Sequence, residues 1–260
     1  MNIKFTLNIF INKIMRSIRQ HYFDVQQIEY LHNDNCILVD KTDKVLRSST
    51  KFECHLKTNI NTGMLHRAFS LFLFDSNSNL LLQQRSDKKI TYPLHFTNTC
   101  CSHPLYVVDE MDTKDNIGIR RAAVRKLNHE LGMTIDSDNV KFITRILYKA
   151  DNFVPNSMKI ESSEEYDKYG ENELDYILVS KLDKDWRQIS TNINSNEVAT
   201  IKWVSQSDLK NFIANCNCKD IPISPWFNLI YCNGFLNRIW DNLYQLDSIM
   251  NSNEIIDFSE

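Results

Sequence analysis

Residues 117–133, IGIRRAAVRKLNHELGM, decide the fold more than any other stretch of this 260-residue chain. Apolar side chains recur there every four residues, which places Ile119, Ala123, Leu127 and Leu131 on one face of an α-helix. Asp115 or Asn116 stands where a capping residue would begin the helix, and Gly132 stands where a glycine usually ends one. The stretch therefore predicts one amphipathic helix packed on an apolar surface.

Strand-like segments lie on both sides of this helix. They are short, and they are rich in the β-branched, aromatic and apolar residues typical of strands. We predict strands at residues 36–40, after the polar turn 41–43, and at 67–74, 80–84, 140–148, 174–179 and 200–204. Residues 75–79, DSNSN, have strong turn chemistry and predict a hairpin.

Three other segments complete the expected architecture. We predict a loop containing Asn59, Asn61 and Gly63, a short helix after Ser205 or Ser207, and a last helix from Pro225 to about Tyr244. Strands and helices in this order indicate an α+β fold, with a mixed sheet flanked by helices.

The composition narrows the class of protein. The hydrophobic fraction of 42% and charged fraction of 24% are ordinary for a globular domain. A net charge of −3 gives no reason to expect nucleic-acid binding, and no apolar run approaches the roughly 18 residues of a membrane span. Seven cysteines, an odd number, form no disulfide framework, which favours a reducing compartment.

Two polar segments contain the residues that could act as acid/base groups or metal ligands. Residues 97–104 read TNTCCSHP and residues 169–176 read YGENELDY. In an extended backbone, residues two apart share a face, so Cys101 and His103 would point one way, as would Glu171 and Glu173. If the segments face each other, they bring a thiol, an imidazole and two carboxylates to one point, which suits a metal ion beside an acid/base pair. Either pair alone is a weak signal, since a Glu-x-Glu pair is more often a solvated edge.

The sequence motifs in and around these segments resemble those of a known family. LHRAF at 65–69, LLQQRS at 81–86, TNTCCSHP at 97–104 and YGENELDY at 169–176 occur in this order at compatible spacing. The chain closely resembles the type I isopentenyl-diphosphate isomerases over residues 36–243. Those enzymes share the Nudix fold, and residues 125–133, RKLNHELGM, look like a decayed Nudix box. Lys126 and His129 stand where that motif has glutamate and only Glu130 remains, so the resemblance implies the fold without the hydrolase chemistry.

The resemblance also implies a divalent-metal site made of three histidines and two glutamates. These are His55, His66, His103, Glu171 and Glu173, a nitrogen and oxygen set that suits Mg²⁺, Mn²⁺ or Zn²⁺. It implies in addition that Glu130 helps to hold a Mg²⁺ ion bridging to the substrate diphosphate. Individually, each histidine could equally be a satisfied core residue.

The other roles implied by the resemblance concern the substrate. Cys101 and Glu173 are the expected acid/base pair, with Tyr148 close to Glu173. Five residues are expected to bind substrate: Lys51, Arg85, Lys89, Ser102 and Trp226. Cationic groups suit diphosphate oxygens, and the indole face of Trp226 suits a carbocation. Tyr148 and Trp226 would look the same from sequence if they were only core aromatics.

The resemblance implies the interconversion of isopentenyl diphosphate and dimethylallyl diphosphate, by proton addition at one carbon and removal at another through a tertiary carbocation. Such chemistry needs a pocket that excludes water. Two alternatives remain open from the residues: a true Nudix diphosphohydrolase, which the lost glutamates disfavour, and a non-catalytic, metal-stabilised binding module. We expect a monomer acting on this small molecule in the cytoplasm.

The chain divides into four expected parts. Residues 1–35 form an N-terminal extension, 36–63 the first strands with a metal-ligand loop, 64–214 a Nudix-like catalytic domain, and 215–260 a C-terminal helical segment. Residues 1–23 contain four Lys and Arg and no acidic residue, so organelle targeting is an alternative to a cytoplasmic location.

Three local features depart from the family pattern or carry no motif. Leu94 replaces a glycine in the turn Pro93-Leu94-His95, so the turn must tolerate it, and His95 is expected to lie outside the metal set. An insertion at residues 151–168 is interpreted as a flap. Cys216-Asn217-Cys218 is interpreted as incidental, because no second cysteine pair accompanies it.

Overall fold

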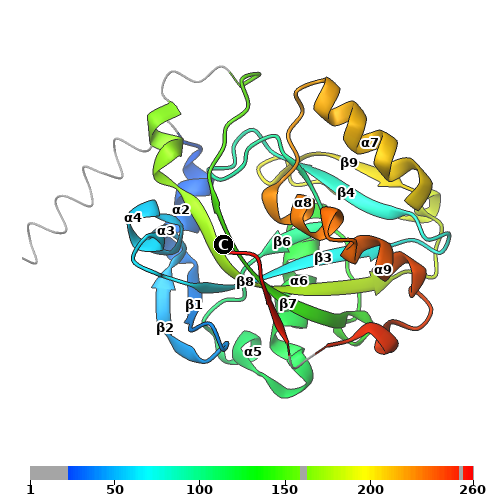
Figure 1. Cartoon of the computed structure of the whole chain (residues 1–260), viewed down its shortest axis with the longest axis horizontal. Coiled ribbons are helices and arrows are strands. Elements are labelled where there is room, and N and C mark those ends of the chain that lie inside the picture. The colour runs from blue at the N-terminus through cyan, green and yellow to red at the C-terminus, as the bar shows by residue number, and fades with distance from the viewer. Residues whose placement is uncertain (1–22, 159–162, 252–253, 260) are drawn as a thin grey trace, which may run out of the picture.

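The computed structural model describes residues 23–158, 163–251 and 254–259. Within those ranges, ten strands form one mixed sheet, with a main path in the order β10-β7-β8-β3-β1-β2 (Figure 1). The strands are β1 (Asn35–Val39), β2 (Val45–Thr50), β3 (His66–Phe74), β4 (Leu80–Arg85), β5 (Phe96–Thr97), β6 (Cys100–Ser102), β7 (Lys141–Asp151), β8 (Gly170–Lys181), β9 (Val198–Val204) and β10 (Ile255–Asp257).

Helices cover both faces of this sheet. They are α2 (Val25–Asn33), α3 (Lys51–His55), α4 (Lys57–Ile60), α5 (Val108–Met111), α6 (Ile117–Leu131), α7 (Gln206–Cys218), α8 (Pro225–Cys232) and α9 (Phe235–Asp241). Short 3-10 turns occupy Lys114–Asn116, Ser137–Asn139, Ser163–Lys168, Trp186–Gln188 and Leu246–Ile249. The predicted α+β architecture with a mixed sheet is confirmed.

Strand β3 is the spine of the sheet and separates two cores. It runs parallel to β8, and its side chains alternate between the two faces. Phe69, Leu71 and Leu73 pack into the core under α6, with the predicted helix stripe of Ile119, Ala123, Leu127 and Leu131. Phe72 and Phe74 pack into the opposite core, which α8 and α9 close (Figure 1). The second face carries the candidate site.

Helix α6 confirms the predicted boundaries with one difference in its cap. Gly132 ends the helix in the left-handed conformation, with φ of +65°. Asn116 begins it but also has a left-handed backbone, and its side chain makes no capping hydrogen bond. The N–H of Gly118 instead donates to the carbonyl of Asp112, so a backbone group satisfies the first turn.

Two expectations for local structure were wrong. The predicted loop between His55 and His66 begins with helix α4, and helix α3 precedes it. The Thr50 side chain and the Glu53 carboxylate form a capping box that starts α3. The predicted last helix is two helices, because Gly234, with φ of +75°, interrupts it.

The N-terminal part and the insertion both pack against the domain where they are described. Helix α2 lies within the predicted extension, and residues 1–22 lie outside the described chain. Asn152, in the insertion, is buried and donates to the carbonyls of Ile90 and Tyr166, while its oxygen accepts from the N–H of Tyr92. Residues 159–162 are not described, and the interpretation of 151–168 as a flap stays a prediction. The four-part division also stays a prediction, and α7 crosses its boundary at 214.

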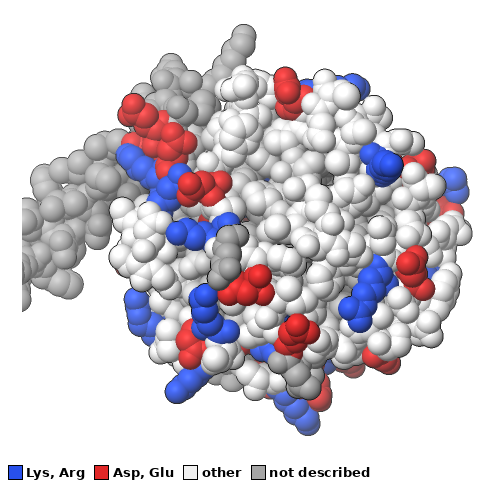
Figure 2. Space-filling model, viewed as in Figure 1, with Lys and Arg blue, Asp and Glu red and all other residues white. Residues whose placement is uncertain are grey.

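Two findings bear on membranes and charged partners. In the described ranges, no helix is long and apolar enough to cross a bilayer. On the face shown in Figure 2, Lys and Arg side chains are interspersed with Asp and Glu around a largely uncharged centre. Among the described residues on that face, Lys and Arg form no extended basic surface.

Candidate functional site

One pocket gathers every predicted site residue except His66, which is fully buried. The predicted residues that line it are Lys51, His55, Arg85, Lys89, Cys101, Ser102, His103, Glu130, Tyr148, Glu171, Glu173 and Trp226. Ser70, Thr91 and Lys126 also line it, and the sequence interpretation had assigned them no role. Residues from most of the chain length therefore meet at one place.

Strand register explains how the acid/base residues come together. Glu173 in β8 lies opposite His66 in β3 and opposite Tyr148 in β7. Cys101 in β6 lies opposite Ser70 in β3, four residues along from His66 and on the same face. The expectation that residues two apart would share a face is met, because Glu171 and Glu173 both line the pocket.

Three imidazoles and two carboxylates form what we call the metal end of the pocket: His55, His66, His103, Glu171 and Glu173. Each offers one ligand atom, and these atoms lie within 4.8 Å of one another. The three imidazole ring centroids are 4.8–4.9 Å apart in every pairing. All five side chains are buried, so their ligand atoms converge on a point shielded from bulk water.

The hydrogen-bond inventory fits a divalent cation at this point. His55 Nδ1 lies 2.6 Å from the carbonyl oxygen of Lys51, which leaves Nε2 free to ligate. Within the described chain, His55 Nε2, both ring nitrogens of His66 and Glu171 Oε2 are buried and make no hydrogen bond of good geometry. His55 Nε2 nevertheless lies 2.9 Å from Glu171 Oε2, and His66 Nε2 lies 3.4 Å from Glu173 Oε1. Imidazole nitrogens and carboxylate oxygens that converge in this way form a donor set that fits a divalent cation. Glu130 is not part of this set.

The Cys101 thiol lies between the metal end and Arg85. Burial raises the pKa of Cys101 to about 12, and the nearby Arg85 guanidinium only partly offsets that rise. Arg85 Nη1 is 3.7 Å from the Cys101 sulfur. The thiol therefore holds its proton at neutral pH. The adjacent Cys100 points to the other face and is fully buried in the core under α6.

Glu173 is surrounded by proton donors. The Tyr148 hydroxyl donates to its Oε2, and His103 Nε2 lies 2.7 Å from its Oε1. Burial raises the pKa of the Tyr148 hydroxyl well above its ordinary value, so this group remains a donor. Burial also acts to raise the pKa of Glu173, but His66 and Tyr148 outweigh it and the pKa lies below its usual value.

Trp226 and Arg85 form one wall of the pocket. The Trp226 indole N–H donates to Asn98 Oδ1 at 3.0 Å, which fixes the ring. The Arg85 guanidinium carbon lies 5.6 Å from the centre of that ring. The Nε and Nη2 groups of Arg85 donate to the carbonyl of Thr91, so its remaining Nη1 group is directed toward the pocket.

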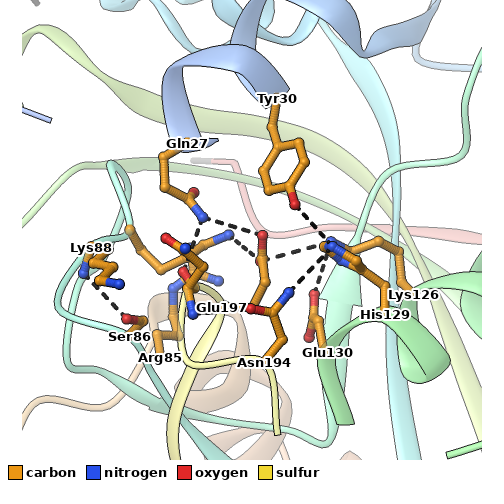
Figure 3. A network of polar contacts seen from close by, with 12 residues as sticks. Gln27, Tyr30, Arg85, Ser86, Lys88, Lys126, His129, Glu130, Asn194 and Glu197 are labelled. Carbon is orange, nitrogen blue, oxygen red and sulfur yellow. Dashed lines mark hydrogen bonds and ion pairs between the residues drawn. The ribbon is translucent and has the colours of Figure 1, made fainter. Parts of the chain in front are cut away.

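At the other side of the pocket lies a group of paired charges that we call the lysine end: Lys89, Lys126, Glu130 and Glu197. Lys89 Nζ is 2.7 Å from Glu197 Oε2, and Lys126 Nζ is 3.7 Å from the same oxygen. Lys126 Nζ is also 3.2 Å from Glu130 Oε1 (Figure 3). Every charged group of the lysine end therefore has an opposite charge beside it.

Sequence reasoning missed two residues of the lysine end. From the sequence, Lys126 was interpreted only as the loss of a glutamate from the Nudix box. A lysine at that position also adds a positive charge. Glu197 lies in a polar segment before β9, and no motif marks it. Ser70 was also missed, and the alternation along β3 could have placed it on the face of His66.

The departures noted in the sequence have structural counterparts. Leu94 has a φ of +60°, so the turn does hold a non-glycine residue in the left-handed region. Burial lowers the pKa of His95 to about 4, and its Nδ1 lies 2.9 Å from the carbonyl of Pro93, outside the metal end. Cys216 is buried and Cys218 exposed.

Comparison with known proteins agrees with this geometry. A family model for the NUDIX domain matches residues 64–227. The chain is 40% identical to isopentenyl-diphosphate Delta-isomerase 1 of Mesocricetus auratus, over 93% of this chain and 99% of that protein. It is 42% identical to isopentenyl-diphosphate Delta-isomerase of Dictyostelium discoideum, over 86% and 88% of the two chains. It is 43% identical to the chloroplastic isopentenyl-diphosphate Delta-isomerase II of Arabidopsis thaliana, over 85% and 73%.

These relatives match nearly the whole chain and not the Nudix domain alone. The matched region contains the thiol, the glutamates and the three histidines that the pocket brings together. The chain therefore belongs to the Nudix superfamily and, within it, to the family of isopentenyl-diphosphate Delta-isomerases.

Proposed function

We propose that the pocket interconverts isopentenyl diphosphate and dimethylallyl diphosphate. The observation that carries the proposal is that one pocket holds the Cys101 thiol, the hydrogen-bonded Glu173 carboxylate and a set of cationic side chains. The relatives at 40–43% identity carry the name of this activity. The reaction moves a carbon–carbon double bond without any net oxidation or reduction, so this pocket would need no redox cofactor.

Cys101 and Glu173 are the proposed proton-transfer groups. One adds a proton to the terminal alkene carbon, which leaves the cation on the central carbon, and the other removes a proton from the methylene group attached to that central carbon. The electron pair of that C–H bond forms the new double bond. Each group ends the turnover in the protonation state opposite to the one in which it began, so exchange with solvent must reset the pair. Tyr148, which donates to Glu173, stabilises its ionised form.

Trp226 is proposed to stabilise the tertiary carbocation between the two proton transfers. A carbocation close to the face of an indole is attracted by its quadrupole. The hydrogen bond to Asn98 holds the ring in place, and the ring is 3% exposed. A cation formed there is therefore shielded from water that would trap it.

The metal end is proposed to hold one divalent ion, Mg²⁺, Mn²⁺ or Zn²⁺, through His55, His66, His103, Glu171 and Glu173. When bound, such an ion supplies positive charge that alters the acidity of neighbouring groups. A second ion, Mg²⁺, is proposed to be shared between Glu130 and the substrate diphosphate. Around the diphosphate, Lys51, Arg85, Lys89 and Ser102 are the proposed ligands, and Lys126 joins them because it lines the same pocket.

The proposal is tested by proton NMR of isopentenyl diphosphate with purified protein and Mg²⁺ in deuterated water. Dimethylallyl signals should appear with deuterium incorporated. Their rate of appearance should fall in Cys101→Ala and Glu173→Gln by a factor of about 10² to 10⁴ each, the range that general acid/base groups contribute. The exposed Cys232→Ala serves as the matched thiol control. An unchanged alkene with metal-loaded, folded protein would contradict the proposal.

The same samples address the hydrolase alternative. Lys126 and His129 occupy two glutamate positions of the Nudix box, and both contribute nitrogen groups where a hydrolase would need carboxylates for metals. Release of inorganic phosphate or a nucleoside monophosphate from nucleotide diphosphates would favour the hydrolase. An inert Cys101 thiol in a protein with a permanently bound metal would favour the binding module.

The compartment and the oligomeric state stay predictions: a monomer in the cytoplasm, with organelle import through residues 1–23 as the alternative. A fluorescent protein fused behind residues 1–23 tests the import alternative. Light scattering of the purified chain tests the monomer.

A further inference from the structure

Glu197 is a buried carboxylate that the proposed chemistry does not use. Its side chain is 1% exposed, and it lies immediately before strand β9. It is not among the residues that line the pocket. A buried carboxylate is costly unless cations and hydrogen-bond donors surround it, so its position calls for an explanation from its contacts.

The two oxygens of Glu197 face two different parts of the molecule. Oε2 lies 2.7 Å from Lys89 Nζ and 3.7 Å from Lys126 Nζ. Oε1 accepts from Nε2 of Gln27, at 3.2 Å, and the same amide donates to the carbonyl of Asn196. Figure 3 shows Gln27 reaching down from helix α2 toward Glu197. One carboxylate therefore links the N-terminal helix to two pocket lysines.

Charge explains why the two lysines need this partner. Lys89 comes from the loop after β4 and Lys126 from α6, and both ammonium groups line the pocket. Two ammonium groups this close to one another repel, and each loses hydration in a buried site. Glu197 Oε2, which both lysines share, reduces the repulsion between the ammonium groups and the free-energy cost of their lost hydration. It also fixes the direction of each Lys Nζ–oxygen contact. Because Glu197 is outside the pocket lining, it acts through the lysines and does not itself contact a ligand in the pocket.

We propose that Glu197, held by Gln27 of α2, is a positioning residue that sets Lys89 and Lys126 as a pair for the diphosphate group of the substrate. The proposal rests on the proposed function for the identity of that substrate. The positioning role itself requires only that an anion with several phosphate oxygens binds at the lysine end. Helix α2 thereby becomes part of the binding apparatus, although it contributes no pocket residue.

The test is Glu197→Gln, which keeps the shape and removes the charge. Without the shared carboxylate the two ammonium groups lose the contact that holds them in position, so the affinity for Mg²⁺-pyrophosphate should fall about tenfold by calorimetry. The KM for isopentenyl diphosphate should rise by a similar factor, while kcat changes less, because Cys101 and Glu173 are untouched. The exposed Glu29→Gln on α2 is the matched control and should change neither.

Two further variants keep the test decisive. Glu197→Asp retains the charge on a shorter side chain and should recover part of the pyrophosphate affinity. Gln27→Ala leaves the carboxylate between its lysines and removes only its anchor, so it should give a smaller loss; it replaces Glu197→Gln if that variant does not fold.

The outcomes separate the competing explanations. Unchanged KM with less active protein would mean that Glu197 only supports the fold, and tighter pyrophosphate binding would mean that it competes with the ligand. Either result would overturn the proposal. If the wild-type protein failed to isomerise its substrate but Glu197→Gln still weakened pyrophosphate binding, the proposed function would fall and the positioning role would stand.

Discussion

The metal end and the lysine end lie in the same pocket and handle charge in opposite ways. At the metal end, several imidazole and carboxylate atoms are buried without a hydrogen bond, although His103 and Tyr148 both contact Glu173. At the lysine end, ammonium and carboxylate groups are paired with one another, and Gln83 and Gln27 donate to the remaining carboxylate oxygens. The first arrangement is compatible with a divalent cation bound among its five side chains. The second is already neutralised and must rearrange or share its cations when an anion arrives.

Removing the metal should give the largest difference between the two ends. A ligand at 1,000 times its dissociation constant stabilises the folded state by about 4 kcal/mol. Chelation should therefore lower the melting temperature measured by calorimetry, because three imidazoles and two carboxylates lose the cation that fits among them. Adding back Zn²⁺, Mn²⁺ or Mg²⁺ in turn should restore it and rank the ions. The same melting temperature with chelator and with every ion would contradict a metal at this end.

The lysine end should respond to pH through Lys89. Burial lowers the pKa of Lys89 to about 8, with repulsion from Lys51, Arg85 and Lys126 adding to it and Glu197 opposing it. Below pH 8 the ammonium is charged and binds diphosphate, so KM should rise as pH increases through 8, by about tenfold if one charge-assisted contact is lost.

The stability contribution of Lys89 has the opposite sign. Its folded pKa is below the ordinary value of 10.5, so between about 8 and 10.5 the unfolded chain binds more protons. Its contribution to the free energy of unfolding therefore increases with pH across that window. Lys89→Arg, which stays charged, should flatten the change in KM. An unchanged pH profile in that variant would assign the effect to another group.

The smallest expected effect concerns how α2 is attached. The Tyr30 hydroxyl lies 3.0 Å from Nε2 of His129, the residue that replaces a glutamate in the Nudix box (Figure 3). Tyr30→Phe removes this contact while keeping the ring, and should cost about 1 kcal/mol of stability in urea unfolding. KM should change less than in Gln27→Ala, because Glu197 keeps its own anchor. A larger rise in KM than in Gln27→Ala would show that Tyr30 attaches α2 more strongly than Gln27 does.

The two ends also differ in how far sequence could predict them. The metal end depends on residues two apart in strands, and the alternation of an extended backbone is enough to place Glu171 and Glu173 on one face. Its closure depends on the register between β3 and β8, which long-range packing decides. The sequence predicted that these residues meet only through the resemblance to a family, and not from the strand register itself.

At the lysine end, Glu197 has no periodic pattern or motif, and only tertiary contact gives it a partner. For both errors in local structure, the sequence contains a signal that the prediction did not use. Thr50 and Glu53 are spaced as a capping box, and Gly234 stands where the last helix is broken. The missing Asn116 side-chain cap had no such signal, because a hydrogen bond from the Gly118 N–H to the Asp112 carbonyl, formed only in the folded chain, satisfies the first turn instead.

The parallel pairing of β3 with β8 has a consequence for how the protein is made. Ser70 and Asp175, which hydrogen-bond across this pair, are 105 residues apart in the chain. Contacts this distant in sequence form slowly, because a long loop must close before they add any stability. On the ribosome, β3 leaves the exit tunnel well before β8 is synthesised, and Trp226 follows later still. A nascent chain thus carries the Cys101 thiol and all three histidines for some time before their glutamate partners exist.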